Sequence, residues 1–205
     1  MTFEEFKATV LKGQEAPADL QKLFELQTAR VAHEGEPTDP LEAIYFNLID
    51  PENLPALLSH SYINDSDRAN PDTMANIAAF DEVFLYSTFV AMSDDEDPIG
   101  YWHGPEGTPI SEAPIMMLDS EGQFSLCPGK NISEAMLLHF FGGSQGEENP
   151  EFVCLREWFI ASGFEIATTS LKNIPEPRAS TSHPGDIHFV TYNKFRVAAG
   201  LPPSH

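Results

Sequence analysis

The sequence places proline directly after Asp or Asn at four positions, and this pattern determines where helices can begin. The pairs are Asp39-Pro40, Asp50-Pro51, Asn70-Pro71 and Asn149-Pro150. Asp and Asn accept hydrogen bonds from the free N–H groups of a helix's first turn, and proline fits the first helical position because no N–H is needed there. Each pair therefore predicts a helix start. Thr2 with Glu5 adds a capping box near Met1.

Apolar residues at helical spacing divide the segment before residue 80 into short helices. Five are predicted, marked by Phe3, Phe6 and Val10; by Leu20, Leu23, Phe24 and Val31; by Leu41, Ile44, Tyr45 and Leu48; by Leu54, Leu57 and Leu58; and by Met74, Ile77 and Phe80. The stretch "NDSDRANP" before the fifth helix is predicted to be a loop. Residues 1–80 are therefore expected to form a helical N-terminal region.

The pattern changes at residue 83, where strand-forming residues take over. "VFLYSTFVAM" has no polar face and predicts a central strand that is buried on both sides. Further strands are predicted at "IGYWH", "PIMML" and "QFSLC", with a tight hairpin from Asp119 to Gly122 between the last two. Two helices follow, opened by Asn131 and by Asn149-Pro150. "FEIATTSL" and "DIHFVTY" are predicted to be strands, separated by a long Pro/Ser loop.

These elements predict an α+β protein, with an antiparallel-rich mixed sheet flanked by helices. One domain is expected over residues 1–205. It would comprise the helical N-terminal region over residues 1–80, a sheet with helices over 81–171, and a loop, a strand and a tail over 172–205.

Net charge limits the kind of partner. The chain has 205 residues, with 32 acids against 11 bases and a formal net charge of −21. From Val31 to Gly129 there are nineteen acids and one base, Arg68, so this segment carries −18. Such a field repels nucleic acid and anionic membranes and attracts a cationic partner. The simpler interpretation, that an acidic surface only aids solubility, stays open.

The chain is expected to be cytoplasmic, with free thiols. Its start, "MTFEEFKATVLKG", lacks the basic and apolar stretches of a signal peptide, and no run approaches the ~20 apolar residues of a membrane span. The two cysteines, Cys127 and Cys154, lie in an apolar strand pattern and an apolar helix. Both are predicted to be buried packing residues.

No group of residues specifies a catalytic, metal or cofactor site. A calcium loop needs alternating oxygen ligands, whereas Asp94 to Asp97 are contiguous acids whose side chains alternate in direction. There is no zinc motif, nucleophile elbow or phosphate-binding glycine loop. His139 is predicted to pack inside an apolar helix, and the pair His183 and His188 has no specific spacing. We therefore predict no catalytic residue, no metal and no cofactor.

The stretch from Asp94 to Glu106 is the candidate partner-binding segment. It combines carboxylates with aromatic rings in Asp94, Asp95, Glu96, Asp97, Tyr101, Trp102, His103 and Glu106. The four contiguous acids are expected to form a solvated loop between two strands. Tyr101 and Trp102 face opposite sides of a strand, so one of them could border the acids and suit a partner rich in Arg and Lys. The favoured alternative is that helices bury both rings.

Two stretches of the central block resemble a known family. "FVAMSDDEDPIGYWHG" and "APIMMLDSEGQFSLCPGKNISEAMLLHFF" are similar to the SUKH superfamily, which includes a yeast regulator of cell-wall synthesis and many bacterial immunity proteins. The shared pattern is a strand ending in Phe and Ala, an acidic turn, an Ile-Gly-Tyr-Trp strand and a Pro-Ile-x-x-Leu-Asp strand with an acidic-Gly turn. The match covers residues 80–141. The family's first helix is matched only poorly, by "APADLQKLF"; the N-terminal helical region is longer than is usual in the family, and the segment beyond Gly163 has no counterpart.

The resemblance implies a cytoplasmic α+β protein without enzymatic activity, often the antidote to a toxin delivered between bacteria. Many such toxins are nucleases with basic clefts, which an acidic inhibitor fits by mimicking phosphates. The expected function is therefore non-catalytic binding of a basic protein partner such as a toxin, with neither nucleic acid nor membrane as partner. Two alternatives stay open: a small cytoplasmic hydrolase, and a housekeeping regulator or scaffold.

Overall fold

The computed structural model describes residues 1–30, 35–142, 146 and 148–204. Within these residues, five strands form one sheet in the order β1-β2-β3-β4-β5. The strands are β1 (Phe46–Leu48), β2 (Ser87–Ser93), β3 (Pro98–Trp102), β4 (Ile115–Leu118) and β5 (Phe124–Cys127). Each neighbouring pair is antiparallel. The sheet is therefore entirely antiparallel, whereas an antiparallel-rich mixed sheet was predicted. The α+β class, with a sheet flanked by helices, is confirmed.

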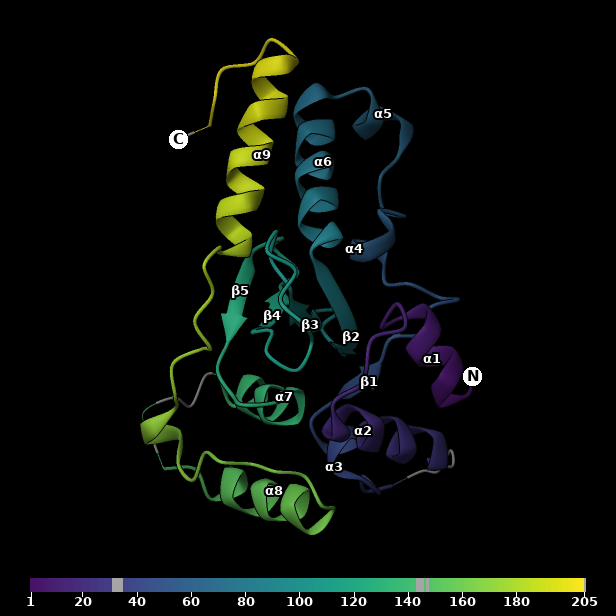
Figure 1. Ribbon diagram of the computed structural model, residues 1–205, viewed down its shortest axis with the longest axis vertical. Coiled ribbons are helices and arrows are strands. Elements are labelled where there is room, and N and C mark those ends of the chain that lie inside the picture. Colours follow the sequence, from purple (N-terminus) through teal and green to yellow (C-terminus); the bar gives the residue numbers. More distant parts are fainter. Residues whose placement is uncertain (31–34, 143–145, 147, 205) are drawn as a thin grey trace.

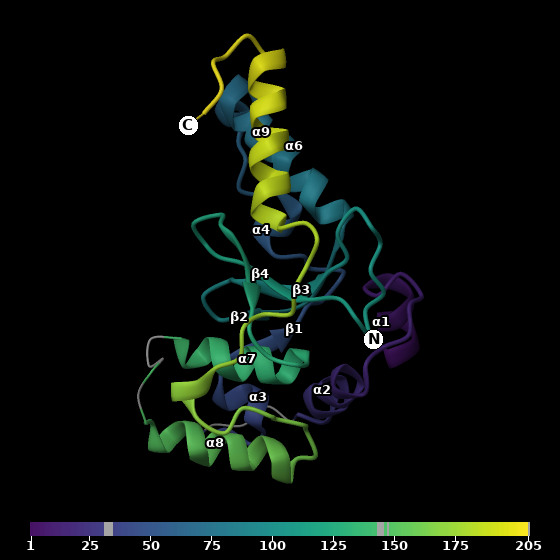
Figure 2. The same ribbon diagram turned by 60° about the vertical axis from the view of Figure 1, so that its left-hand side comes forward.

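The helices gather at two ends of the molecule, with the sheet between them (Figures 1 and 2). At one end, α6 (Pro71–Leu85) and α9 (Pro184–Ala198) stand side by side, near α4 (Ala56–Ser59) and α5 (Asp65–Arg68). The other end holds α1 (Phe3–Thr9), α2 (Ala18–Ala29), α3 (Pro40–Ala43), α7 (Ile132–Phe140) and α8 (Pro150–Ala161). A turn of 3-10 helix spans Leu171–Asn173.

Successive residues of the central strands contribute to two different cores. The larger core joins Ile99, Tyr101 and Ile115 to apolar side chains of α2, α7 and α8. The smaller core joins Trp102 and Met116 to apolar side chains of α6 and α9. Because both faces are covered, every residue of β3 and β4 is buried. The double-sided burial predicted for the stretch that contains β2 is confirmed, because β2 also contributes to both cores.

Gly100 is required by the close approach of β2 and β3. The register between these strands shifts from Phe89 to Ala91, which marks a β-bulge. A Cβ atom added to Gly100 would lie 2.1 Å from the carbonyl oxygen of Thr88. A larger residue would therefore push the two strands apart.

Three of the four predicted Asp/Asn-Pro helix starts are confirmed. The capping residues are Asp39 for α3, Asn70 for α6 and Asn149 for α8. Asp50 is the exception, because its carboxylate accepts hydrogen bonds from the N–H of Glu52 at 3.0 Å and from the side chain of Asn53 at 2.7 Å. These bonds close a single turn, and α4 begins only after Pro55.

The third predicted helix is mostly wrong. α3 ends at Ala43, Tyr45 takes a left-handed conformation with φ of 57°, and Phe46–Leu48 pair with β2 as an edge strand. Phe46 and Leu48 are buried on either side of an exposed Asn47. Pairing with β2 thus outweighs the helical spacing of the apolar residues.

Two further boundaries around α6 differ from prediction. The segment Val83–Leu85 completes α6 and does not begin the central strand, which starts at Ser87. The predicted loop before α6 contains α5, a short helix that begins with a capping box formed by Asn64 and Asp67.

The strand predicted at residues 164–171 is also wrong, although its alternation is real. Phe164, Ile166 and Thr168 are buried, yet the backbone of Ile166 and Thr168 bonds to side chains and not to a strand. The N–H of Thr168 donates to Glu134 Oε1 at 2.6 Å, and Arg156 donates to the carbonyl oxygens of Thr168 at 2.7 Å and Ile166 at 3.3 Å. An extended segment can therefore be satisfied without joining a sheet.

The strand predicted at "DIHFVTY" is helical, so the segment 172–205 contains α9 where a strand was expected. His183 plays the capping role of Asp or Asn, since its Nδ1 accepts a hydrogen bond from the N–H of Gly185 at 3.1 Å. One turn apart, Tyr192 and Arg196 both bind Asp72 of α6, the tyrosine hydroxyl donating at 2.8 Å. These contacts fix α9 against α6.

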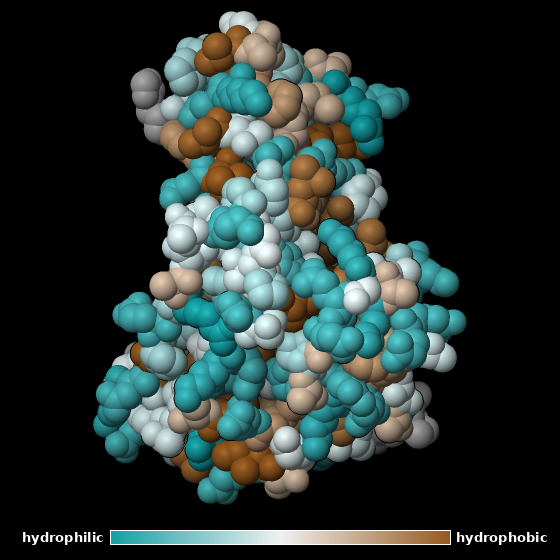
Figure 3. All heavy atoms as spheres, viewed as in Figure 1, coloured by the Kyte–Doolittle hydropathy of each residue, from teal (hydrophilic) through white to brown (hydrophobic). Residues whose placement is uncertain are grey.

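α9 makes contact mainly through one face. Pro184 is its one buried residue, whereas Phe189, Val190 and Val197 remain 47 %, 66 % and 58 % exposed. Apolar side chains accordingly lie among hydrophilic ones over the α6–α9 end of the surface (Figure 3). The docking of α9 thus relies on the face that it turns toward α6 and β5.

His188 lies on that face and makes the stability pH-dependent. Its ring lies 4.8 Å from Phe80 and 5.6 Å from Phe124, and burial lowers the pKa of His188. His188 is therefore protonated at a higher pH in the unfolded chain than in the folded protein. As a result, the free energy of unfolding falls as pH drops from about 6.5 through the folded pKa of His188. We expect His188→Phe to become progressively more stable than the parent between pH 8 and pH 5 in urea unfolding. A pH-independent difference would contradict this.

Candidate functional site

The acidic turn between β2 and β3 presents three carboxylates to solvent. Asp94, Asp95 and Glu96 are exposed, as predicted. The backbone holds the turn, because the N–H of Glu96 donates to the carbonyl of Ser93 at 3.1 Å and Glu96 takes a left-handed φ of 64°. The three side chains are thus held on a fixed backbone.

Asp97 does not belong to this solvated set, which corrects the prediction. The residue is only 9 % exposed, because β3 begins beside it. Burial raises the pKa of Asp97, and the nearby carboxylates of Asp119 and Asp95 raise it further. The N–H of Ser120 and the ring of His139, whose Nε2 lies 3.9 Å from Asp97 Oδ2, lower it. Asp97 therefore ties the β2–β3 turn to the β4–β5 turn.

The β4–β5 turn adds a fourth exposed carboxylate. In a sheet of sequentially connected antiparallel strands, the β2–β3 and β4–β5 turns lie at the same end. Asp119 closes this turn, because its Oδ1 accepts the N–H groups of Glu121 at 3.0 Å and Gln123 at 2.8 Å, as predicted for a tight hairpin with Gly122 at φ 81°. Glu121 is exposed. We call the exposed carboxylates of Asp94, Asp95, Glu96 and Glu121 the acidic rim.

Two hollows flank the acidic rim, and each contains an exposed tyrosine. The first, of about 380 Å³, is lined by Tyr62, Leu57 and Phe80 together with three rim residues. The second, of about 320 Å³, is lined by Tyr45 and Phe140 together with two rim residues. Within the described residues, no Lys or Arg lines either hollow.

The two tyrosines differ in how they are held. Tyr45 is 57 % exposed, and its ring lies 6.0 Å from that of Phe140. Tyr62 is 48 % exposed and packs edge-on against His60 at 6.3 Å. Carboxylates next to aromatic faces suit a guanidinium or ammonium group, which gains an ion pair and a cation–π contact together.

Tyr101 and Trp102 are buried, at 3 % and 0 % exposed, so the favoured alternative is confirmed. They face the two separate cores. Burial also raises the pKa of Tyr101 well above its usual range. Neither ring is available to a partner.

His103 and Glu106 lie beyond the other end of β3 and do not belong to the acidic rim. The ring of His103 is hydrogen-bonded to the hydroxyl of Thr88 at 2.8 Å and to the carbonyl of Thr108 at 2.7 Å. Glu106 accepts hydrogen bonds from the hydroxyls of Thr181 and Ser182, and the bond from Thr181 is the largest cause of its lowered pKa. Both residues hold loops together.

The burial of the cysteines differs from the prediction at one residue, Cys154. Cys127 is buried as predicted, and burial raises the pKa of its thiol to about 12. Cys154 is exposed, because its side of α8 faces away from the core, and the prediction of a buried residue is wrong. His139 is partly buried in α7, and burial lowers its pKa.

The described residues contain no group of three or more His, Cys, Asp or Glu side chains arranged to hold a metal ion. No helix among them has the length and apolar character needed to cross a membrane.

Comparisons with protein-family models, with curated proteins and with solved structures found no significant match. The site is therefore defined here by its geometry.

Sequence reasoning found some of the acidic rim and missed its aromatic neighbours. The contiguous acids were visible, and Glu121 could have been added by noting that two hairpin turns share one end of an antiparallel sheet. Tyr45 and Tyr62 carry no such signal. Tyr45 is predicted to lie in a helix and no predicted element includes Tyr62, so only the fold brings them beside the carboxylates.

Proposed function

We propose that this protein is a non-catalytic, cytoplasmic binding protein that holds a basic protein segment at the acidic rim. One observation carries the proposal: two turns bring four exposed carboxylates together between two exposed tyrosines, and no base among the described residues lines either hollow. Exposed like charges repel each other in the free protein, and a bound cationic partner would offset that repulsion. Such an arrangement therefore favours binding of a cationic partner.

The resemblance to the SUKH superfamily supports the class of partner. Immunity proteins of that family neutralise toxins, and a nuclease toxin presents a basic cleft. In such a complex the rim carboxylates would occupy the positions of phosphates, and Tyr45 and Tyr62 would cover arginine side chains. The partner we propose is therefore a basic protein such as a toxin.

The first experiment uses a fluorescent peptide of twelve arginines as the probe. We expect saturable binding by anisotropy that weakens as sodium chloride is raised from 50 to 300 mM, since the screening length is about 10 Å at 0.1 M salt and shortens as salt rises. A peptide of twelve glutamates is expected not to bind. Binding that is insensitive to salt, or equal for both peptides, would contradict the proposal.

A further inference from the structure

One face of α9 has no partner within the described residues. Phe189, Val190 and Val197 lie on it, because residues seven and eight positions apart follow the same side of a helix. All three side chains are exposed. The contacts that hold α9 come from its other side, where Tyr192 and Arg196 bind α6. The outward face of α9, defined by Phe189, Val190 and Val197, is therefore an apolar surface open to another molecule.

Two charged residues extend the outward face in a self-complementary order. Asp186, Val190 and Lys194 follow one another at intervals of four residues, so they form one row along α9. Asp186 and Lys194 are exposed, and within the described part of the chain neither belongs to a salt bridge. When two copies of α9 pack antiparallel with Val190 against Val190, Asp186 of each copy meets Lys194 of the other. In a parallel pair of the same register, like charges would meet instead.

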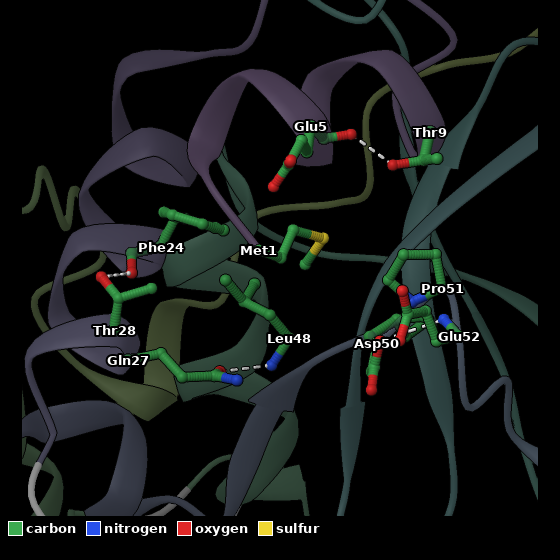
Figure 4. A pocket seen from close by; sticks show the side chains of 11 residues that line it. Met1, Glu5, Thr9, Phe24, Gln27, Thr28, Leu48, Asp50, Pro51 and Glu52 are labelled. Carbon is green, nitrogen blue, oxygen red and sulfur yellow. Dashed lines mark hydrogen bonds between the residues drawn. The ribbon is translucent and has the colours of Figure 1, made fainter.

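Other candidate surfaces disfavour a second copy because they are acidic. The chain has a formal net charge of −21, so two copies repel each other wherever carboxylates face one another. The acidic rim is one such surface. Another is the hollow between α1, α2 and the segment that follows β1, where Glu5, Asp50 and Glu52 line the wall and no Lys or Arg does so among the described residues (Figure 4). α9 differs, because it carries two bases against one acid. The approach of two copies is therefore less repulsive at α9 than at these surfaces.

We propose that α9 is the interface of a homodimer, in which the outward faces of two α9 helices pack antiparallel about Val190. Burial of the three apolar side chains favours association. The two pairs between Asp186 and Lys194 set the antiparallel direction. Interfaces smaller than about 1,200 Å² are weak and transient, so a face made by one helix from each copy is expected to have a dissociation constant on the order of 0.1 mM. No residue of the acidic rim takes part, so the inference does not depend on the proposed function.

Sedimentation equilibrium of the full chain tests for the dimer. The protein is studied from about 10 µM to about 1 mM in 150 mM sodium chloride, which screens the repulsion between the net charges of the two copies. We expect an equilibrium between monomer and dimer. A chain that stays monomeric at about 1 mM would overturn the inference. So would growth into larger assemblies, because a two-fold interface closes at two copies.

A matched pair of valine variants locates the interface. Val190 lies on the outward face, whereas Val153 is an exposed valine of α8. Val190→Glu and Val153→Glu each add one negative charge at an exposed position of a helix, and both are first compared with the parent by urea unfolding. Val190→Glu is expected to raise the dissociation constant of the dimer at least tenfold, and Val153→Glu to leave it within twofold. Equal weakening by the two variants would mean that only net charge matters and would overturn the inference.

Two charge reversals test the antiparallel direction. In a homodimer of Asp186→Lys or of Lys194→Asp, like charges meet at both contacts, so each variant is expected to dimerise at least fivefold more weakly than the parent. A 1:1 mixture restores opposite charges at both contacts. The two variants are therefore expected to associate with each other at least fivefold more tightly than either does with itself. Both variants remain strongly acidic, so their net charges do not draw them together. A mixture that associates no more tightly than the separate variants would overturn the antiparallel dimer.

Discussion

Replacing Trp102 with alanine is expected to lower the free energy of unfolding by about 3–5 kcal/mol. Trp102 is fully buried in the smaller core, and its Nε1–H donates to the carbonyl of Ser182 at 2.9 Å. The substitution removes a large ring between β3 and α6. It also leaves that carbonyl without its donor, and so loosens the segment that leads into α9. Urea unfolding followed by circular dichroism measures the change.

Two other variants separate the causes. Trp102→Phe keeps most of the packing and loses the hydrogen bond, so a smaller loss of about 1–2 kcal/mol is expected. Trp158→Ala changes a partly buried tryptophan of α8 and should cost less than Trp102→Ala. If Trp102→Ala is nearly neutral in stability, the ring does not belong to a packed core and the described fold of β3 is wrong.

Replacing Glu134 with alanine is expected to cost about 2–4 kcal/mol, because it leaves the buried N–H of Thr168 and the part-buried N–H of Lys130 without an acceptor. Glu134 is 0 % exposed, and its carboxylate accepts the N–H groups of Lys130 at 2.7 Å and Thr168 at 2.6 Å. It therefore joins the start of α7 to the extended segment beyond α8.

Glutamine at position 134 keeps one acceptor oxygen, so Glu134→Gln should lose roughly half as much stability as the alanine variant. The matched control is Glu157→Gln on the exposed side of α8, expected within about 0.5 kcal/mol of the parent. A loss below about 1 kcal/mol for Glu134→Ala would show that water or another group replaces the carboxylate.

Local signals predicted the elements that local chemistry determines. Asp and Asn before Pro marked three helix starts, and Gly122 with Asp119 marked the hairpin between β4 and β5. One continuous apolar run predicted the double-sided burial of β2. These features depend on a few neighbouring residues, so the sequence alone is sufficient to find them.

The errors arose where a distant partner decides the structure. The residues of β1 have helical spacing, but they form a strand because they pair with the edge of β2. The segment 164–170 alternates like a strand but is satisfied by Glu134 and Arg156. α9 is rich in β-branched and aromatic residues, yet Asp72 and Phe80 of α6 give it a helical docking face.

In the candidate site, too, local sequence predicted some features correctly and distant contacts determined the others. Three exposed acids were predicted correctly from their contiguity, whereas Asp97 became buried because β3 begins beside it. One of Tyr101 and Trp102 was the candidate for an aromatic residue facing a partner, with burial of both rings favoured, and both are buried. The exposed aromatic residues beside the acids are Tyr45 and Tyr62, which come from elsewhere in the chain.

The central claim is that the acidic rim, and not the net charge of −21, binds a basic partner. The rim variant changes Asp94 and Asp95 to Asn, and Glu96 and Glu121 to Gln. The matched control removes the same number of charges from exposed positions outside the rim, namely Glu25, Glu157, Glu165 and Glu176, each changed to Gln.

The decisive measurement is the dissociation constant of the twelve-arginine peptide for parent, rim variant and control variant, at 50 and 150 mM sodium chloride. All three proteins are first shown to have the same free energy of unfolding in urea within about 0.5 kcal/mol, as expected for exposed substitutions. We predict that the rim variant binds at least tenfold more weakly than the control variant, with a reduced salt dependence, because the attractive charges lie together at one place. Equal weakening of the two variants would show that the peptide responds to overall charge alone and would contradict the account.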